Sequence, residues 1–181
     1  RSTLFPYTTL FRSLCLSISG AKFKYVNGQS TKALSLDGTY GLKLLDDASK
    51  LGESYTISFA MKASEAGSAV NPTITAGTFS PEYWLNLTLD GKIWSHDANG
   101  YIDTTASGAY TAGKWQTVTL VVDGSKQGKT EGTVSGKLYV DGTVVTEGSV
   151  ASDIMKKSGA AVYFGVNAWS QIGRASCRER V

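Results

Sequence analysis

The chain has 181 residues, of which 41% are hydrophobic and 18% are charged, with 18 Lys and Arg against 15 Asp and Glu. This length suits one domain with a sizeable core. The sequence contains no run of 18 apolar residues, which a membrane-spanning helix would need, so we predict no membrane insertion. Residues 14–170 carry 13 Lys and 14 acidic residues. The net basic charge therefore comes from the two ends, and we predict no nucleic-acid partner.

The two ends of the chain are predicted to be non-native. Read in frame, a common short-read sequencing adapter translates to RSTLFPYTTLFRS, which is residues 1–13. Its reverse complement translates to IGRASCRERV, residues 172–181, followed by a stop codon. We therefore treat residues 1–13 and 171–181 as translated adapter. Residues 14–170 are then one domain, expected to be a metagenomic fragment of a longer gene.

β-strand patterns follow one another along the chain. The stretch ESYTISFAMKA alternates strictly, so that Tyr55, Ile57, Phe59 and Met61 share one face of a strand. We predict hairpins at ALSLDGTYGLKL (33–44), YWLNLTLDGKIWSHD (83–97) and KLYVDGTVVTE (137–147), and strands at KWQTVTLVVDG (114–124) and AVYFGVNAW (161–169).

Asp-Gly pairs occur within or at the end of the predicted hairpins and strands. Both residues tolerate the positive φ that tight turns demand, so each pair is predicted to be a turn. The four pairs begin at Asp37, Asp90, Asp123 and Asp141. Helical signal is confined to one short turn each in residues 44–52 and 152–159. The prediction is an all-β fold made of two packed antiparallel sheets.

The hairpin at residues 83–97 decides which tryptophan is buried. If Asp90-Gly91 is a two-residue turn, Leu87 faces Trp94 and Leu85 faces His96. The two leucines mark their face as the core face, so Trp94 is predicted to be buried with them. Trp84 is then predicted to lie on the outer or concave face. A bulged turn would reverse part of this arrangement.

The strand sequences together resemble a known family. KALSLDGTYGLKL, SYTISFAMKA, WLNLTLDGKIWS, GKWQTVTLVVDG, GKLYVDGTVV and AVYFGVNAW stand in the order found in the laminin-G-like jellyroll of the concanavalin A-like lectin/glucanase superfamily. The resemblance implies a two-sheet jellyroll over residues 32–169. In that family a further strand follows the last of these segments. Here residues 171–181 occupy its place, so we expect the C-terminal closing strand to be missing and those residues to be frayed or poorly paired.

Catalysis is not expected. Glycan-hydrolysing enzymes of this fold use two carboxylates facing one cleft, about 5–5.5 Å apart in retaining enzymes. The acidic residues here lie in predicted turns and loops, and none lies in a predicted central strand. We therefore predict a non-catalytic domain, with a glucanase fragment as one alternative.

A metal site has little support from the sequence. His96 is the only histidine and has no cysteine nearby. Asp97, Asn99 and Asp103 carry the oxygen ligands that calcium prefers, but their spacing fits Asx turns in a surface loop better. We therefore predict no cofactor, with calcium as the alternative.

Aromatic side chains carry the functional signal. Sugars stack their C–H faces on Trp or Tyr rings, while amides bind the hydroxyl groups. The predicted ligand-binding residues are Trp84, Asn86, Tyr101, Asn167 and Trp169, whereas Trp115 is predicted to be structural. The resemblance implies a secreted or cell-surface carbohydrate-binding module of bacterial origin, attached to other domains of a glycoside hydrolase. The other alternative is a protein-binding adhesion or spacer module without a sugar site.

Overall fold

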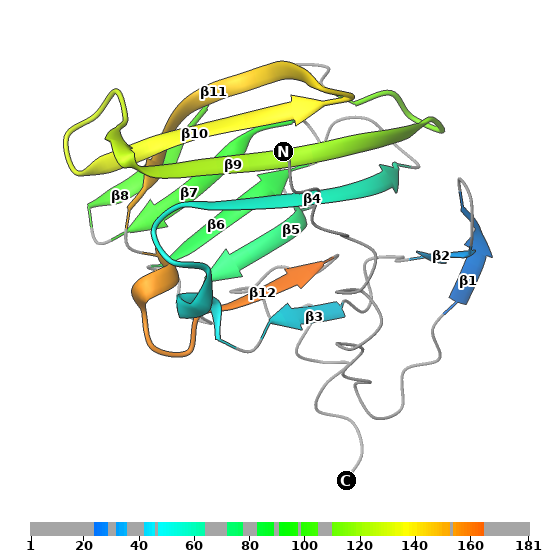
Figure 1. Cartoon of the computed structure of the whole chain (residues 1–181), viewed down its shortest axis with the longest axis horizontal. Helices are drawn as coiled ribbons and strands as arrows, with labels where there is room; N and C mark the ends of the chain where they lie inside the picture. The colour runs from blue at the N-terminus through cyan, green and yellow to red at the C-terminus, as the bar shows by residue number, and fades with distance from the viewer. Residues whose placement is uncertain are drawn as a thin grey trace, which may run out of the picture.

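The computed structural model describes the chain in ten stretches, which are residues 24–28, 32–35, 42–45, 47–63, 72–77, 83–88, 91–97, 99–104, 110–152 and 154–164. These residues form two large antiparallel sheets that pack face to face, and a separate pair of strands (Figure 1). None of the described helices is long and apolar enough to span a membrane.

The larger sheet has six strands. Its order is β3 (Leu42–Leu45), β12 (Ala161–Phe164), β5 (Pro72–Gly77), β6 (Trp84–Thr88), β7 (Ile93–Asp97) and β8 (Gly100–Asp103). The four-stranded sheet has the order β11 (Thr143–Ala151), β10 (Thr133–Val140), β9 (Trp115–Gln127) and β4 (Tyr55–Lys62). The separate pair is β1 (Lys24–Asn27) with β2 (Lys32–Ser35).

The core lies between the two large sheets. On β4 the predicted alternation is confirmed, because the residues from Tyr55 to Met61 at every second position pack on the core and those between them are exposed. On the opposite sheet Leu85, Leu87 and Ile93 are completely buried. The Phe59 and Phe164 rings, from different sheets, meet with centroids 4.8 Å apart. Burial of such side chains is the main stabilising contribution of the sandwich.

Polar contacts join β11 to the β7–β8 end of the other sheet. The Ala151 amide donates to Ser95 Oγ at 3.1 Å, and Thr146 Oγ1 donates to the Gly91 carbonyl at 2.9 Å. Both hydroxyls are buried and have hydrogen-bond partners, as burial of polar groups requires. These contacts close one end of the sandwich and fix the position of β7.

One predicted hairpin and one predicted turn need correction, whereas Asp37-Gly38 lies outside the described residues. Residues 33–44 do not form a hairpin, because β2 pairs with β1 whereas β3 pairs with β12. Asp123-Gly124 lies inside β9 and is not a turn. Gly124 is needed there for a different reason, since a Cβ at that position would lie 2.6 Å from the Glu53 carbonyl oxygen.

Other local predictions are confirmed. The β10–β11 hairpin turns at Asp141-Gly142, where both residues have positive φ, 50° and 82°, as two-residue hairpin turns of this type require. The two short helical turns are 3-10 helices, η2 (Ala48–Leu51) and η3 (Ile154–Lys156). The strands β1, β5 and β8 are additions that the sequence patterns did not indicate.

The β6–β7 hairpin differs from the two-residue prediction by one position. Thr88 donates from its amide to the Lys92 carbonyl at 3.1 Å, so the loop between them holds three residues, 89–91. Leu87 is consequently paired with Ile93, and Asn86 with Trp94. Because neighbouring residues point to opposite faces, the shift moves Trp94 from the core to the outer face, beside Trp84. The prediction for Trp84 is confirmed and that for Trp94 is wrong.

Candidate functional site

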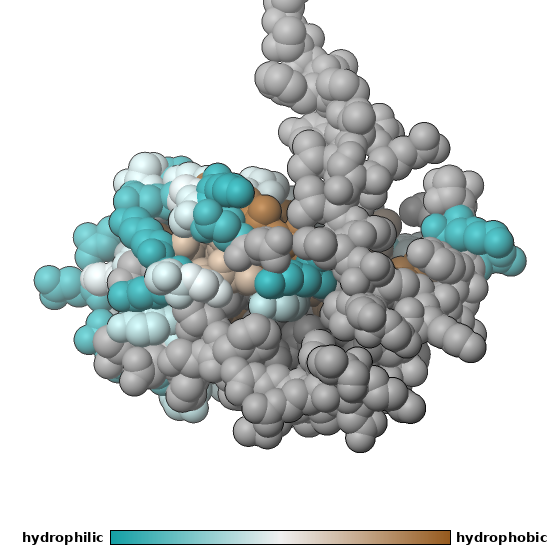
Figure 2. Space-filling view, turned by 90° about the horizontal axis from the view of Figure 1, so that it is seen from below, coloured by the Kyte–Doolittle hydropathy of each residue, from teal (hydrophilic) through white to brown (hydrophobic). Residues whose placement is uncertain are grey.

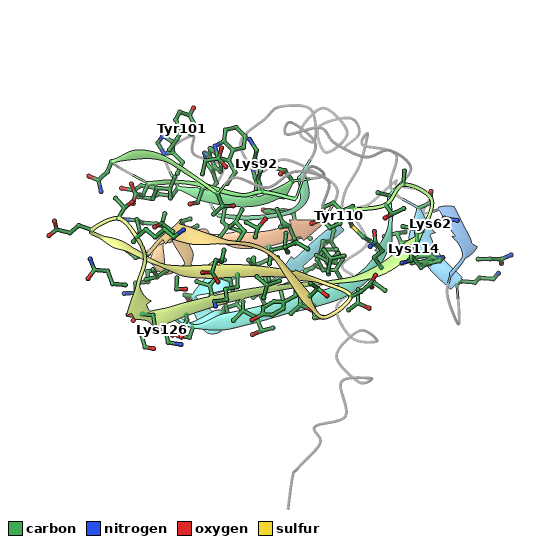
Figure 3. The ribbon with its side chains drawn as sticks, turned by 90° about the horizontal axis from the view of Figure 1, so that it is seen from above. Lys62, Lys92, Tyr101, Tyr110, Lys114 and Lys126 are labelled. Atoms are coloured by element: carbon green, nitrogen blue, oxygen red, sulfur yellow. The ribbon has the colours of Figure 1, made fainter. Side chains whose placement is uncertain are left out.

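The candidate site is the outer face of β6, β7 and β8, which we call the aromatic face. Alternation places its side chains opposite to the core-facing Leu85, Leu87 and Ile93. In Figure 3 the labelled side chains Tyr101 and Lys92 lie on the side of this sheet away from the other sheet. Two cross-strand rows make up the aromatic face: Trp84, His96 and Tyr101 in one, and Asn86, Trp94 and Asp103 in the other.

The four rings of the aromatic face pack as two crossed pairs. Trp94 and Tyr101 are nearly parallel, at 17°, with centroids 5.8 Å apart, and Trp84 and His96 are inclined by 27° at 5.7 Å. Between the pairs the rings meet edge to face, at 76° for Trp84 with Trp94 and at 85° for His96 with Tyr101. Edge-to-face contacts are favourable for aromatic rings and hold each one in a fixed orientation.

Exposure falls steeply across the three strands. Tyr101, on β8, is 70% exposed, and Trp94 and His96, on β7, are half-buried. On β6, Trp84 is 2% exposed and Asn86 is 1% exposed. Burial on the aromatic face therefore increases from Tyr101, on the edge strand β8, to Trp84 and Asn86 on the inner strand β6.

Asn86 places an unsatisfied polar atom in the buried part of this face. Its Oδ1 is buried, and within the described part of the chain it has no hydrogen-bond partner. A buried acceptor left in this state destabilises a protein by about 1–3 kcal/mol. Such an atom calls for a specific explanation, and a ligand hydroxyl that donates to it is one.

An ion pair between Lys92 and Asp103 lies at one end of the second row. Lys92 Nζ lies 3.4 Å from Asp103 Oδ2, and both side chains are partly exposed. Thr88 Oγ1 accepts a hydrogen bond from the Lys92 amide at 3.2 Å, which holds the base of the lysine in place. This ion pair offers both a donor and an acceptor beside the rings.

The structure brings together three of the five predicted site residues. Trp84, Asn86 and Tyr101 all lie on the aromatic face, whereas Asn167 and Trp169 lie outside the described residues. Trp94 and His96 were missed as site residues because the two-residue turn placed them with the leucines. A register that pairs Leu85 with Ser95 and Leu87 with Ile93 keeps small or apolar residues together on the core side. That pattern would have placed Trp94 and His96 on the outer face.

Other aromatic candidates lie elsewhere. Tyr110 is 5% exposed and belongs to the core. Trp115 begins β9 on the side opposite to the core residues Val118 and Leu120, and it is half-buried. The inward positions of β9 are the even-numbered ones, so Trp115 lies outside the core, and its structural role stays a prediction.

The acidic residues of the HDANGYID stretch point in opposite directions. Asp97 lies on the core side of β7, and its Oδ1 accepts from the Asn99 amide at 2.7 Å, which is the predicted Asx turn. Asp103 lies on the aromatic face. Both residues are in strands and not in a loop, but they do not face one cleft as a carboxylate pair or a shared calcium site requires. No cluster of three or more His, Cys, Asp or Glu occurs among the described residues.

A polar hollow of about 190 Å³ lies at the end of the β9–β10 hairpin, away from the aromatic face. Its described lining is Gln127, Gly128, Lys129, Ser135, Glu147 and Gly148. None of these side chains has a ring on which a sugar can stack. Seen from below, the described surface is mostly hydrophilic, with a small hydrophobic patch (Figure 2).

Comparison with protein families decides the classification. The family described as the concanavalin A-like lectin/glucanases superfamily matches residues 36–175. The chain belongs to this superfamily. The prediction of an all-β, antiparallel two-sheet jellyroll is thereby confirmed. The domain boundaries at residues 14 and 170 stay a prediction.

Solved structures of this superfamily's fold are similar over most of the chain. Domain 4 of AbnA, a GH43 extracellular arabinanase from Geobacillus stearothermophilus solved with arabinotriose, aligns with a TM-score of 0.65 and 24% identity, over 84% of this chain and 71% of that one. The CBM40 of Ruminococcus gnavus IT-sialidase, solved with α2,3 sialyllactose, aligns with a TM-score of 0.48 and 17% identity, over 74% and 80%. No curated protein matches the chain in sequence.

Proposed function

We propose that this chain is a non-catalytic carbohydrate-binding module and that its ligand binds on the aromatic face. The observation that carries the proposal is the combination of an exposed ring, Tyr101, with a buried unsatisfied amide oxygen on Asn86. Sugars present both kinds of surface, since their C–H faces stack on aromatic rings and their hydroxyls need hydrogen-bond partners.

The binding mechanism follows from the geometry. A sugar ring stacks on Tyr101 and on the adjoining edge of Trp94, while Lys92 and Asp103 bind hydroxyl groups beside the rings. The rings are already fixed by their edge-to-face contacts, so little conformational entropy is lost on binding. The proposal also places the module outside the cell and attaches it to a glycoside hydrolase. Both features are properties of the arabinanase whose domain 4 shares this fold.

A glycan array tests the proposal. We expect the full chain to bind plant or host glycans and Tyr101→Ala to lose most of that binding, because the exposed ring is the stacking surface. Tyr139→Ala is the matched control, since Tyr139 lies half-buried on β10 in the other sheet. Binding to no glycan, or equal loss with both variants, would contradict the proposal and favour a spacer or adhesion module. Hydrolysis of a bound glycan would favour a glucanase.

A further inference from the structure

The charge that the described residues bring to the aromatic face is one ion pair. Lys92 stands immediately before β7, and its Nζ lies 3.4 Å from Oδ2 of Asp103 at the end of β8. None of the residues described for β6, β7 and β8 is a Lys or Arg. The Asp103 side chain is 42% exposed, whereas the Lys92 side chain is 29% exposed. The positive charge of Lys92 is therefore already balanced by a carboxylate that is the more accessible of the two groups.

The sequence around the aromatic face has an excess of acidic residues. Between residues 82 and 104, Lys92 is the only lysine and there is no arginine. The same stretch contains four acidic residues, which are Glu82, Asp90, Asp97 and Asp103. An excess of one sign of charge disfavours the approach of ligands with the same sign, while uncharged ligands are unaffected. The strands of the aromatic face therefore belong to a segment that disfavours anions.

Asp103 stands beside the surface on which a sugar would stack. Tyr101 and Asp103 lie two residues apart on the same face of the edge strand β8, a separation of about 7 Å along the strand. Trp94, whose ring is nearly parallel to that of Tyr101, is directly opposite Asp103 on β7. The hydroxyls of a sugar stacked on Tyr101 can therefore donate to this carboxylate. The carboxylate of an acidic sugar in the same place would meet a like charge.

The ion pair also limits what Lys92 can do for an acidic sugar. A lysine without an acidic partner attracts a carboxylate, but Lys92 is already paired with Asp103. Binding of an acidic sugar to Lys92 would exchange one carboxylate for another. That exchange leaves Asp103 next to the negative charge of the ligand, and like charges placed side by side weaken binding.

We infer that the aromatic face binds uncharged glycans in preference to acidic ones, and that Asp103 determines this preference. The inference rests on the proposed function and adds the class of ligand to it. Asp103 accepts hydrogen bonds from the hydroxyls of a neutral sugar that stacks on Tyr101. The same carboxylate repels a uronic or sialic acid at that position.

The test is a calorimetric titration of the full chain with pairs of oligosaccharides that differ in charge. Trisaccharides of glucose, galactose and mannose are each compared with the derivative in which the primary hydroxyls are oxidised to carboxylates, and lactose is compared with sialyllactose. We expect the neutral member of a pair to bind about fivefold more tightly or better, the effect of one like-charge contact at a surface. A smaller difference, or tighter binding of the acidic member, would overturn the inference and leave carbohydrate binding intact. If no member of any pair binds, the proposed function fails, and the inference fails with it.

Substitution of Asp103 identifies the source of the preference. Asp103→Asn removes the charge and keeps the size of the side chain, so we expect the two members of a pair to bind within about twofold of each other. Asp123→Asn is the matched control, since Asp123 also pairs with a lysine, Lys126, but lies on β9 in the other sheet. It changes the net charge equally and should leave the affinity ratio unchanged. An equal change in both variants, or none in Asp103→Asn, would overturn the role of Asp103.

Salt gives a second readout on the unmodified chain. Raising the ionic strength from about 0.01 M to about 1 M shortens the screening length from about 30 Å to about 3 Å. The affinity for the acidic member of a pair should therefore rise relative to that for the neutral member. A ratio that does not change with salt would show that charge repulsion is not the cause and would overturn the inference.

Discussion

Trp84 and Tyr101 belong to one aromatic cluster but have opposite roles in it. Their centroids are 5.9 Å apart, yet Trp84 is 2% exposed and Tyr101 is 70% exposed. The buried Trp84 ring packs against the rings of Trp94 and His96 and holds them in position. Under the proposed function, Trp84 therefore contributes to stability and Tyr101 to binding, although both stand in the same row.

This separation predicts the effect of removing each ring. Trp84→Ala should lower the free energy of unfolding by about 3–5 kcal/mol, because it leaves a large cavity under the cluster. Tyr101→Ala should change it by less than about 0.5 kcal/mol, as exposed substitutions do. Urea unfolding followed by circular dichroism measures both values. Equal losses in the two variants would show that Tyr101 also supports the fold.

Asp141 links the β10–β11 turn to β9. Its Oδ1 accepts a hydrogen bond from the Thr117 amide at 2.9 Å, and its Oδ2 accepts one from Gln116 Nε2 at 3.3 Å. These hydrogen bonds lower the pKa of Asp141 below its ordinary value of 3.8. A lowered folded-state pKa means that the ionised carboxylate stabilises the fold at pH values above the unfolded-state pKa.

The pH dependence of an isosteric variant follows from that shift. Asparagine tolerates the positive φ of this turn, so Asp141→Asn removes the charge and keeps the backbone. At pH 7 the variant should melt at a lower temperature than the wild type. As the pH falls below about 4 toward the folded-state pKa, Asp141 becomes protonated and the difference should disappear. A difference that stays constant from pH 7 to about pH 2 would contradict this role of the carboxylate.

At the scale of elements, two opposed glycines allow close packing around β11, one within its own sheet and one against Thr104, which follows β8. Gly136 and Gly148 are cross-strand partners. A Cβ at Gly136 would overlap Val150 Cγ2, and one at Gly148 would lie 2.6 Å from Thr104 Cγ2. The absence of a Cβ at both positions permits this close packing of β11.

Filling either position should strain this contact. Gly136→Ala and Gly148→Ala are each expected to lower the free energy of unfolding by about 1–3 kcal/mol, the usual effect of overpacking. Ser135→Ala, one residue from Gly136 on the outward side of β10, should change it by less than about 0.5 kcal/mol. Chemical unfolding of the three variants gives the comparison. A neutral Gly136→Ala would mean that the Val150 side chain can shift without loss of stability.

The elements also show how far sequence patterns predict this fold. Strict alternation was sufficient for β4, and the Asp141-Gly142 pair was sufficient for the β10–β11 turn, because both signals are local. The partners of β2 and β3 are not indicated by any local pattern, since β3 pairs with β12 from the far end of the chain. Asp123-Gly124 resembles a turn, but its glycine meets Glu53, which is distant in sequence.

The candidate site was predicted in part for the same reason. Trp84, Asn86 and Tyr101 were identified by residue type, which does not depend on register. Trp94 and His96 depended on whether the β6–β7 loop holds two or three residues. One residue of loop length moves every side chain of β7 to the other face, and the Asp90-Gly91 pair is compatible with both lengths.

At the scale of the whole molecule, the sandwich has two outer faces with different chemistry. The outward side of β4 presents Thr56, Ser58 and Lys62, and its neighbour β9 presents Thr117. On the other sheet, the outward side of β6, β7 and β8 presents the aromatic cluster. Only the second face combines ring surfaces with a buried acceptor in the described residues. The fold thus supplies a rigid support for the proposed site on one of its two outer faces.

The most direct test of this account is an NMR titration of the isotope-labelled chain with the glycan that binds best on the array. We expect the largest chemical-shift changes at the side chains of Trp84, Trp94 and His96 and at the backbone amides of β8, with little change at β4 and β9. Shifts centred on the β9–β10 hollow or on the outward side of β4 would place the ligand elsewhere and contradict the account.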